Sequence, residues 1–184
     1  GKYFYYYFVH VKIIYSKIIK YATLAQSKFS LPPESMEAFT RIKLANRNIV
    51  ETIKDIRGLR KNVSQYMLSD NKYIQKEYDK LRHKVSRVLR EIYVIQKDKT
   101  PETHLKRLQV LKEKADKSDV LLNGTLDKLI REQKISSIMA TSLANDSDNV
   151  AGIMKRLIET TELLYINSDT LIRSTEQEKK ESVE

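Results

Sequence analysis

The sequence predicts an all-α fold, an elongated up-and-down bundle of four to five long antiparallel helices. Apolar residues recur at alternating steps of three and four through most of the 184 residues, a spacing that keeps them on one side of an α-helix. Only four glycines and three prolines are present, which is typical of helical proteins rather than of sheets with tight turns. Because a helix of about 30 residues is roughly 45 Å long, we expect one rod-shaped domain over residues 1–184.

The first predicted helix covers about residues 3–28 and begins with a dense aromatic cluster. Its apolar stripe consists of Phe4, Phe8, Val11, Tyr15, Ile18, Ala22, Ala25 and Phe29. Four tyrosines among residues 3–7 make its start apolar on nearly every side, and such a helix needs cover on every side. The start is either an ordinary bundle helix or a contact for a partner chain or lipid interface, because tyrosine suits a boundary with one wet side. In the second interpretation, the contacting side chains are Tyr3, Phe4, Tyr7 and Phe8.

Prolines and turn residues delimit the second and third helices. Pro32 and Pro33 begin a second helix that runs to about Leu68, because proline is tolerated in a first helical turn. Asp70 and Asn71 are turn and cap residues, and a third helix follows to about Lys97. The stripe of the second helix is Ile42, Ala45, Ile49, Thr52, Ile56, Leu59, Val63 and Tyr66. The stripe of the third is Ile74, Tyr78, Leu81, Val85, Val88, Ile92 and Ile95.

A fourth helix is predicted from Pro101 to about Glu132. Its stripe is Leu105, Leu108, Leu111, Ala115, Ser118, Leu122, Leu126 and Leu129. The dipeptide Asn123-Gly124 resembles a turn, but the leucines beyond it resume the stripe. We therefore expect a kink or a tolerated glycine rather than a break.

The fifth predicted helix covers residues 135–165, with Ser136 or Ser137 as its cap. Asp146 lies on its apolar stripe, and an aspartate is expensive to bury without a partner. We therefore expect either a metal ion or an ion pair with a cation of the second helix. The candidate cations are Arg47, Lys54 and Arg57. Residues 176–184 are charged and unpatterned, so we expect a frayed tail there.

The usual signatures of enzymes are missing, so we expect a non-catalytic protein. The sequence has no glycine-rich phosphate loop, no nucleophile elbow and no HExxH motif. It has no cysteine, which excludes disulfides, thiolate zinc sites and cysteine nucleophiles. His10, His83 and His104 lie on different predicted helices beside polar or basic residues, so we expect three exposed histidines and no zinc triad.

One pair of carboxylates is spaced for metal binding. Glu51 and Asp55 are four residues apart, so both lie on one side of the second helix. Carboxylates on facing helices of a bundle hold divalent or iron ions. Asp146 is the preferred third ligand, and Glu113, Asp116 and Asp119 of the fourth helix are further candidates. The alternative is that these charges simply face water.

The third helix has a basic outer side, and the whole chain has a formal net charge of +10. Its candidate contacts for an anionic surface are Lys76, Lys80, Arg82, Lys84 and Arg87. Anionic lipid attracts each such residue by about 1 kcal/mol. Nucleic acid is disfavoured as the partner, because the helix is committed to a bundle and no aromatic residues interleave with its cations in a ladder.

No segment of the sequence has the character of a membrane span. The most apolar run, Tyr3 to Val9, is followed at once by His10 and Lys12, whereas a span needs roughly 20 apolar residues. The first residue is glycine rather than methionine, so we expect the native chain to begin upstream of Gly1.

Two segments carry a resemblance to a known family. Residues 126–147, LDKLIREQKISSIMATSLANDS, resemble the cytoplasmic C-terminal part of bacterial sodium/phosphate cotransporter family proteins, in which a Lys-Ile-Ser link precedes an Ala-Thr-Ser-Leu-x-Asn-Asp run. Residues 53–62, IKDIRGLRKN, resemble the same region. Those cytoplasmic parts are similar to the PhoU family of helical phosphate-signalling proteins. The resemblance implies a PhoU-like bundle that binds metal through paired Glu/Asp-x-x-x-Asp motifs, and Glu51 with Asp55 matches one copy, without a clean second copy.

From this resemblance we expect a non-catalytic regulatory or accessory domain of a sodium-dependent phosphate transporter, at the cytoplasmic face of the inner membrane. Its expected partners are the membrane-spanning part of the same transporter, an anionic lipid surface and further copies of the chain in a homo-oligomer. The aromatic helix in residues 1–30 would then follow the last span. Two alternatives stay open: a free-standing PhoU-like bundle that senses metal or phosphate, and a structural coiled-coil interaction protein.

Overall fold

The computed structural model describes residues 2–97 and 101–166, which form helices joined by short turns and loops. The helices are α1 (Lys2–Lys28), α2 (Pro33–Met67), α3 (Lys72–Lys97), α4 (Pro101–Asp116), α5 (Thr125–Arg131) and α6 (Ser137–Tyr165). No strand occurs in these two ranges. The predicted all-α fold is therefore confirmed, with six helices in the described chain instead of four or five.

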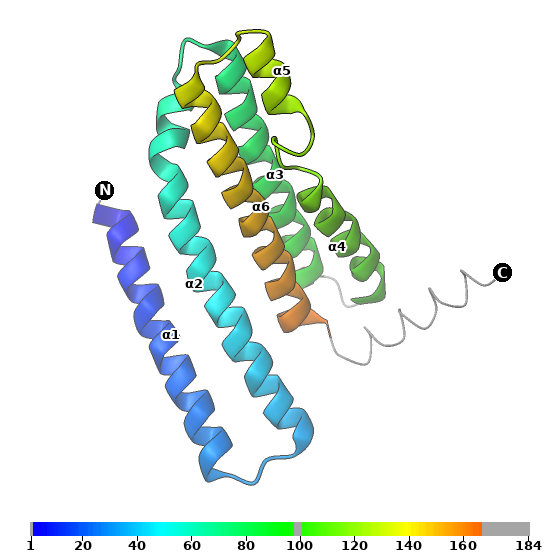
Figure 1. The fold of residues 1–184 in the computed structure, drawn as a ribbon. Helices are drawn as coiled ribbons and strands as arrows, with labels where there is room; N and C mark the ends of the chain where they lie inside the picture. The colour runs from blue at the N-terminus through cyan, green and yellow to red at the C-terminus, as the bar shows by residue number, and fades with distance from the viewer. Residues whose placement is uncertain (1, 98–100, 167–184) are drawn as a thin grey trace, which may run out of the picture.

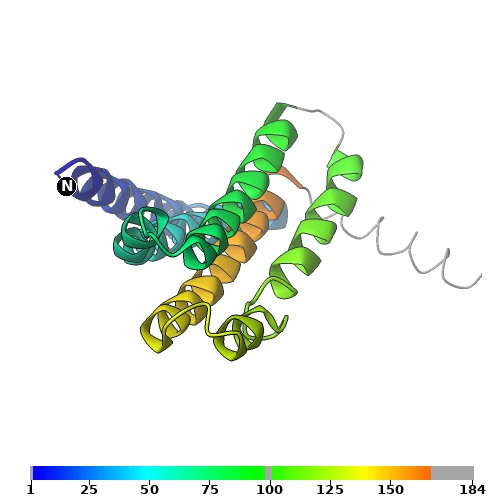
Figure 2. The same ribbon diagram turned by 90° about the horizontal axis from the view of Figure 1, so that it is seen from above.

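Helix α6 lies at the centre of the helical bundle (Figures 1 and 2) and packs against α2, α3, α4 and α5. The largest side chains that are completely buried come mainly from α3, α4 and α6. They include Tyr78, Ile74, Leu108, Leu143, Ile153 and Ile158. Burial of this apolar surface against α6 is the main force that holds the helices together.

Helix α1 packs along α2, and the two form a hairpin at the edge of the molecule (Figure 1). Helix α2 thus lies between α1 and α6. The predicted stripe of α2 is only half correct for this reason. Its buried members are Ala45, Thr52, Leu59 and Tyr66, whereas Ile42, Ile49 and Ile56 are exposed. Because α2 is covered on two sides, positions off the stripe are also buried, as Val50 is.

The predicted fourth helix is broken by a loop over residues 117–124, which corrects the expectation of one helix from Pro101 to Glu132. Gly124 has a φ of +75°, a conformation that glycine adopts readily and that cannot continue an α-helix. The Asp119 and Asn123 side chains each accept a 3.0 Å hydrogen bond from the backbone N–H two residues later, as in Asx turns. Leu122, a member of the predicted stripe, is 79% exposed at the tip of this loop.

Both ends of α6 are held by specific side chains. At its start, the Ser136 hydroxyl accepts a hydrogen bond from the Met139 N–H, which confirms Ser136 as the cap. At its end, the Arg41 guanidinium from α2 donates to the carbonyl oxygens of Glu162 and Leu163 at 3.0 Å, and also to that of Ile166. A cation suits this end of a helix, where the last carbonyl groups lack partners within the helix.

Some expectations concern residues outside the described part of the structure. The side chains of Tyr3, Phe4, Tyr7 and Phe8 are among these, so their contact with a partner stays a prediction. The same holds for the tail over residues 176–184. Within residues 2–97 and 101–166, no helix has both the length and the apolar character that crossing a bilayer requires.

Candidate functional site

Asp146 is buried in the centre of the bundle and is hydrogen-bonded to Tyr78 of α3. Asp146 is only 4% exposed, and its Oδ2 accepts a 2.6 Å hydrogen bond from the Tyr78 hydroxyl. Burial raises the pKa of Tyr78, and the hydrogen bond to Asp146 raises it further, so the phenol remains a protonated donor. The prediction of a buried, partnered acid is confirmed. The predicted partners Arg47, Lys54 and Arg57 are wrong, because the carboxylate reaches α3 instead of α2.

A second tyrosine makes a parallel contact beside the first. The Tyr66 hydroxyl of α2 donates a 3.1 Å hydrogen bond to the Ser142 hydroxyl of α6. The rings of Tyr66 and Tyr78 lie 4.8 Å apart between centroids, tilted by 38°, a favourable spacing for an aromatic pair. Helices α2 and α3 therefore each bury a tyrosine ring in the core, and the hydroxyl group of each tyrosine donates a hydrogen bond to a residue of α6.

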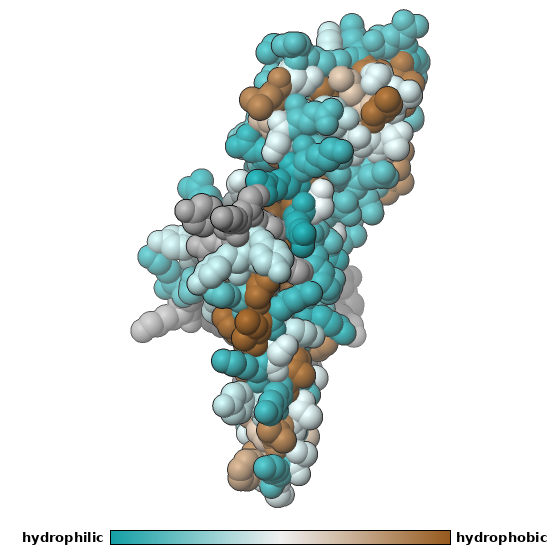
Figure 3. Space-filling model, turned by 90° about the vertical axis from the view of Figure 1, so that its left-hand side faces the viewer, coloured by the Kyte–Doolittle hydropathy of each residue, from teal (hydrophilic) through white to brown (hydrophobic). Residues whose placement is uncertain are grey.

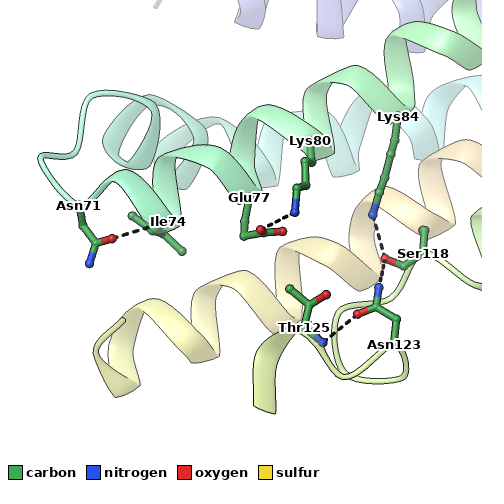
Figure 4. A network of polar contacts seen from close by, with 8 residues as sticks. All are labelled: Asn71, Ile74, Glu77, Lys80, Lys84, Ser118, Asn123 and Thr125. Carbon is green, nitrogen blue, oxygen red and sulfur yellow. Dashed lines mark hydrogen bonds and ion pairs between the residues drawn. The ribbon is translucent and has the colours of Figure 1, made fainter. Parts of the chain in front are cut away.

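Ser147 of α6 also fixes the loop between α4 and α5. Ser147 is completely buried, and its hydroxyl accepts a 3.1 Å hydrogen bond from the Val120 N–H. From the other side, the Lys84 ammonium donates a 2.8 Å hydrogen bond to the Ser118 carbonyl oxygen (Figure 4). Ser142, Asp146 and Ser147 thus serve to join α2, α3 and the loop to α6. We call these three residues and their partners the polar layer.

The three carboxylates predicted to bind metal each have a different partner. Glu51 pairs with Lys54 on the same helix, Asp55 pairs with Arg156 of α6, and Asp146 is bound by Tyr78. Among the described residues, no three His, Asp or Glu side chains are grouped closely enough to hold a metal ion. The structure therefore does not bring Glu51, Asp55 and Asp146 together.

The Asp55–Arg156 pair instead joins α2 to α6. Both side chains are 30% exposed, so the pair lies at the margin of the interface. The Arg156 guanidinium lies over Gly152, where an added Cβ would be 3.3 Å from its Nη2 atom. The absence of a side chain at Gly152 thus leaves room for the arginine to lie along α6.

The basic residues of α3 do not form one continuous free surface. Lys80 pairs with Glu77 at 2.6 Å, and Arg82 pairs with Asp79 at 3.7 Å. Lys84 is half-buried, and burial lowers the pKa of its ammonium group. Its ammonium group holds the loop through a hydrogen bond (Figure 4), and its contact with an anionic surface stays a prediction. The two remaining predicted contacts, Lys76 and Arg87, are exposed.

One of the three histidines departs from expectation. His10 and His83 are exposed as predicted, whereas His104 is almost completely buried in α4. The basic residues that follow it in sequence, Lys106 and Arg107, point to solvent on the other side of the helix. Neighbours in sequence were therefore a poor guide to the exposure of His104.

A pocket between α1 and α2 was not apparent from the sequence. It has a volume of about 340 Å³ and is lined by Lys12, Tyr15, Ser16, Arg47, Val50, Glu51 and Lys54. Three cations and two hydroxyl groups meet a single carboxylate there, which suits an anion better than a metal ion. The residues come from two helices and are more than 30 positions apart in sequence, so only the spacing of Arg47, Glu51 and Lys54 on one helix could have indicated it.

Comparisons with known protein families, curated proteins and solved structures found no significant match to this chain. The described residues offer two distinctive features. The first is the polar layer that ties α2, α3 and the 117–124 loop to α6, and the second is the cationic pocket between α1 and α2.

Proposed function

We propose that this chain is a non-catalytic, PhoU-like regulatory domain on the cytoplasmic side of a sodium-dependent phosphate transporter. The observation that carries the proposal is the position of the segment that resembles such transporters. Its Ala-Thr-Ser-Leu-x-Asn-Asp run, residues 140–146, lies in α6, the helix against which α2, α3, α4 and α5 pack. Ser142 and Asp146 of this run receive hydrogen bonds from neighbouring helices, as expected of residues that serve packing rather than chemistry.

The second similar segment supports the same interpretation. Residues 53–62 lie on α2, which packs along α6, and Asp55 within them pairs with Arg156 of α6. The second segment therefore lies on a helix that packs along α6, the helix that carries the latter part of the first segment. On this proposal, the domain acts by packing against the transporter or against a second copy of itself, which changes the balance between open and closed states of the transport path.

The test is made on the complete gene product, including whatever precedes residue 1. We expect several upstream stretches of about 20 apolar residues and sodium-driven uptake of radiolabelled phosphate into proteoliposomes. We also expect the variant Y66F/Y78F, which removes two hydroxyl groups from the polar layer, to change the uptake rate. The matched control Y73F/Y93F alters two exposed tyrosines of α3 and should leave uptake unchanged. A gene product without upstream spans, or equal uptake by all three proteins, would contradict the proposal.

A second candidate function is a free-standing phosphate sensor, which the cationic pocket favours. Lys12, Arg47 and Lys54 surround a space large enough for a small phosphorylated molecule. Calorimetric titration with inorganic phosphate would show saturable binding to the wild type and weaker binding to R47Q. Elemental analysis of the purified protein would separate this candidate from a metal sensor, which would hold stoichiometric iron, zinc or magnesium.

A further inference from the structure

Helix α1 is covered on one side only. Ala22 is buried against α2, with Tyr15 and Ile18 half-buried beside it. No helix other than α2 makes a comparable contact with α1 in the described chain, and α1 forms the outer edge of the molecule (Figures 1 and 2). The side of α1 that faces away from α2 is therefore open.

The open side of α1 combines apolar, aromatic and basic side chains. We call it the outer α1 face, and it consists of Tyr6, Ile13, Lys17, Lys20, Tyr21 and Leu24. All six are exposed, and their spacing places them within about 100° of arc at 100° per residue. Figure 3 views this edge of the molecule, and hydrophobic and hydrophilic side chains alternate over its narrow lower part.

The charge of α1 limits what can cover this face. Residues 1–33 contain five lysines and no aspartate or glutamate, and the first acidic residue of the chain is Glu34. The nearby pocket adds Arg47 and Lys54 against one carboxylate. Two copies of the outer α1 face would repel each other, because like charges would be brought together at low separation. A complementary surface must therefore be anionic.

The apolar members of the face distinguish between anionic partners. Exposed Ile13 and Leu24 gain nothing from a nucleic-acid backbone, whereas they gain free energy by entering the boundary between lipid headgroups and acyl chains. Tyrosine is enriched at this same boundary, where its ring is buried and its hydroxyl stays wet. Lysines that flank the apolar residues can extend to the headgroup phosphates.

We propose that the outer α1 face docks on an anionic phospholipid surface, with the helix lying in the plane of the membrane. Ile13 and Leu24 enter the acyl boundary, Tyr6 and Tyr21 lie at headgroup level, and Lys17 and Lys20 contact phosphates. The proposal does not rest on the transporter assignment, because a peripheral protein without any membrane span would dock in the same way. It also differs from docking through α3, where Lys80 and Arg82 are engaged in ion pairs and Lys84 is turned inward.

The first test measures binding of the 184-residue chain to phosphatidylcholine vesicles with and without 30 mol% phosphatidylglycerol. Because each lysine near an anionic surface strengthens binding about fivefold, K17Q/K20Q should bind the anionic vesicles about 30-fold more weakly. The matched variants are K106Q/K114Q, on the exposed side of α4, and K76Q/R87Q, on α3. Both should bind as the wild type does. Equal binding by K17Q/K20Q and the wild type, or a larger loss in K76Q/R87Q, would overturn the proposal.

The second test locates the contact directly and uses the absence of cysteine from the chain. Tyr21 and Leu122 are 74% and 79% exposed, on α1 and on the α4–α5 loop. We would label Y21C and L122C with an environment-sensitive fluorophore. Anionic vesicles should shift the emission of the label at position 21 to the blue and leave position 122 unchanged. A shift at neither position, or an equal shift at both, would count against docking through α1.

A second copy of the chain is the competing occupant of this face. Self-association through α1 would shift the label at position 21 without vesicles, in step with protein concentration, and light scattering would show a dimer. That outcome would replace the lipid proposal. Circular dichroism and urea denaturation of each variant check that the fold is retained, which exposed substitutions rarely disturb by more than about 0.5 kcal/mol.

Discussion

The Tyr78 hydroxyl of α3 donates a 2.6 Å hydrogen bond to the Asp146 carboxylate of α6, and both side chains are buried. Tyr78 is completely enclosed, so water cannot replace it as a donor without a change in packing. The hydrogen bond therefore offsets part of the cost of burying the polar Asp146 side chain.

Removing the Tyr78 hydroxyl should destabilise the fold. A hydrogen bond to a charged group contributes about 1.5–3 kcal/mol, so we expect Y78F to lower the free energy of unfolding by about 2 kcal/mol in urea denaturation at pH 7. The control Y73F alters an exposed tyrosine of the same helix and should stay within about 0.5 kcal/mol of the wild type. An equal decrease in the free energy of unfolding in both variants would show that the Tyr78–Asp146 hydrogen bond does not stabilise the fold.

The same variant should reveal the raised pKa of Tyr78. The pKa of this phenol lies above its ordinary value of 10.0 in the folded protein. Above pH 10 the unfolded chain therefore loses a proton that the folded chain keeps, so wild-type stability falls as pH rises. Y78F has no phenol that can titrate at this position. The difference in free energy of unfolding between the wild type and Y78F should therefore become smaller between pH 9 and pH 11. A constant deficit over this range would contradict the raised pKa.

The ion pair between Asp55 and Arg156 should contribute measurable coupling between α2 and α6. A double-mutant cycle with D55N and R156Q should give a coupling free energy of about 1 kcal/mol, at the upper end for pairs that retain solvent contact. The matched cycle uses D116N and K155Q, a pair between α4 and α6 whose side chains are about half exposed. That cycle should give less than about 0.5 kcal/mol. The ranking would fail if the more exposed pair showed the larger coupling.

Glycine-to-alanine substitutions at two positions should have opposite signs. Gly124 has a φ of +75°, so G124A forces alanine into the left-handed region and should cost about 1–2 kcal/mol. Gly58 lies within α2 with nothing within 4 Å of an added Cβ, so G58A should stabilise the protein by about 1 kcal/mol. Thermal unfolding of the two variants beside the wild type checks both signs. A stabilising G124A would mean that the loop does not need the positive φ.

Neutralising Glu162 should stabilise the protein at pH 7. Burial raises the pKa of this carboxyl, against the opposing influence of Lys112, so the folded state favours its protonated form. The contribution of Glu162 to the free energy of unfolding is fully present below its ordinary pKa of 4.5. This contribution is lost as the pH rises through the raised pKa that Glu162 has in the folded protein. E162Q should therefore be more stable than the wild type at pH 7 and indistinguishable from it near pH 4.

The exposed Glu113 of α4 provides the control for this effect. E113Q should show no comparable gain at pH 7 in the same urea series. A gain for E162Q that persisted at pH 4 would assign the effect to packing rather than to the charge.

Helical periodicity predicted most of the fold because each long helix buries a stripe against its neighbours. Helical periodicity failed for α2, which is covered by other helices on two sides. It also failed where the apolar stripe of one predicted helix continued beyond a loop. Leu126 and Leu129 are buried as a continuous helix would predict, although the loop before them breaks that helix. The signal for a loop was Asn123-Gly124, and Gly124 has a positive φ directly before α5, although α4 already ends at Asp116.

The burial of Asp146 was predictable, but its partner was not. A polar residue on an apolar stripe indicates a buried group with a partner. The partner was sought among cations, whereas Tyr78 lies on the apolar stripe of α3 and offers a hydroxyl at its tip. In a periodicity pattern a tyrosine is treated as an apolar residue, but in a core its hydroxyl group can also donate a hydrogen bond. The sequence alone does not distinguish these two roles.

The hairpin of α1 and α2 has a mechanical consequence. Within the described chain, α1 has no substantial contact except with α2, so a force applied at α1 travels into the molecule along α2. The far side of α2 packs along α6 and bonds to it through Arg41, Asp55 and Tyr66. A displacement of α1 would therefore reach α6 through α2.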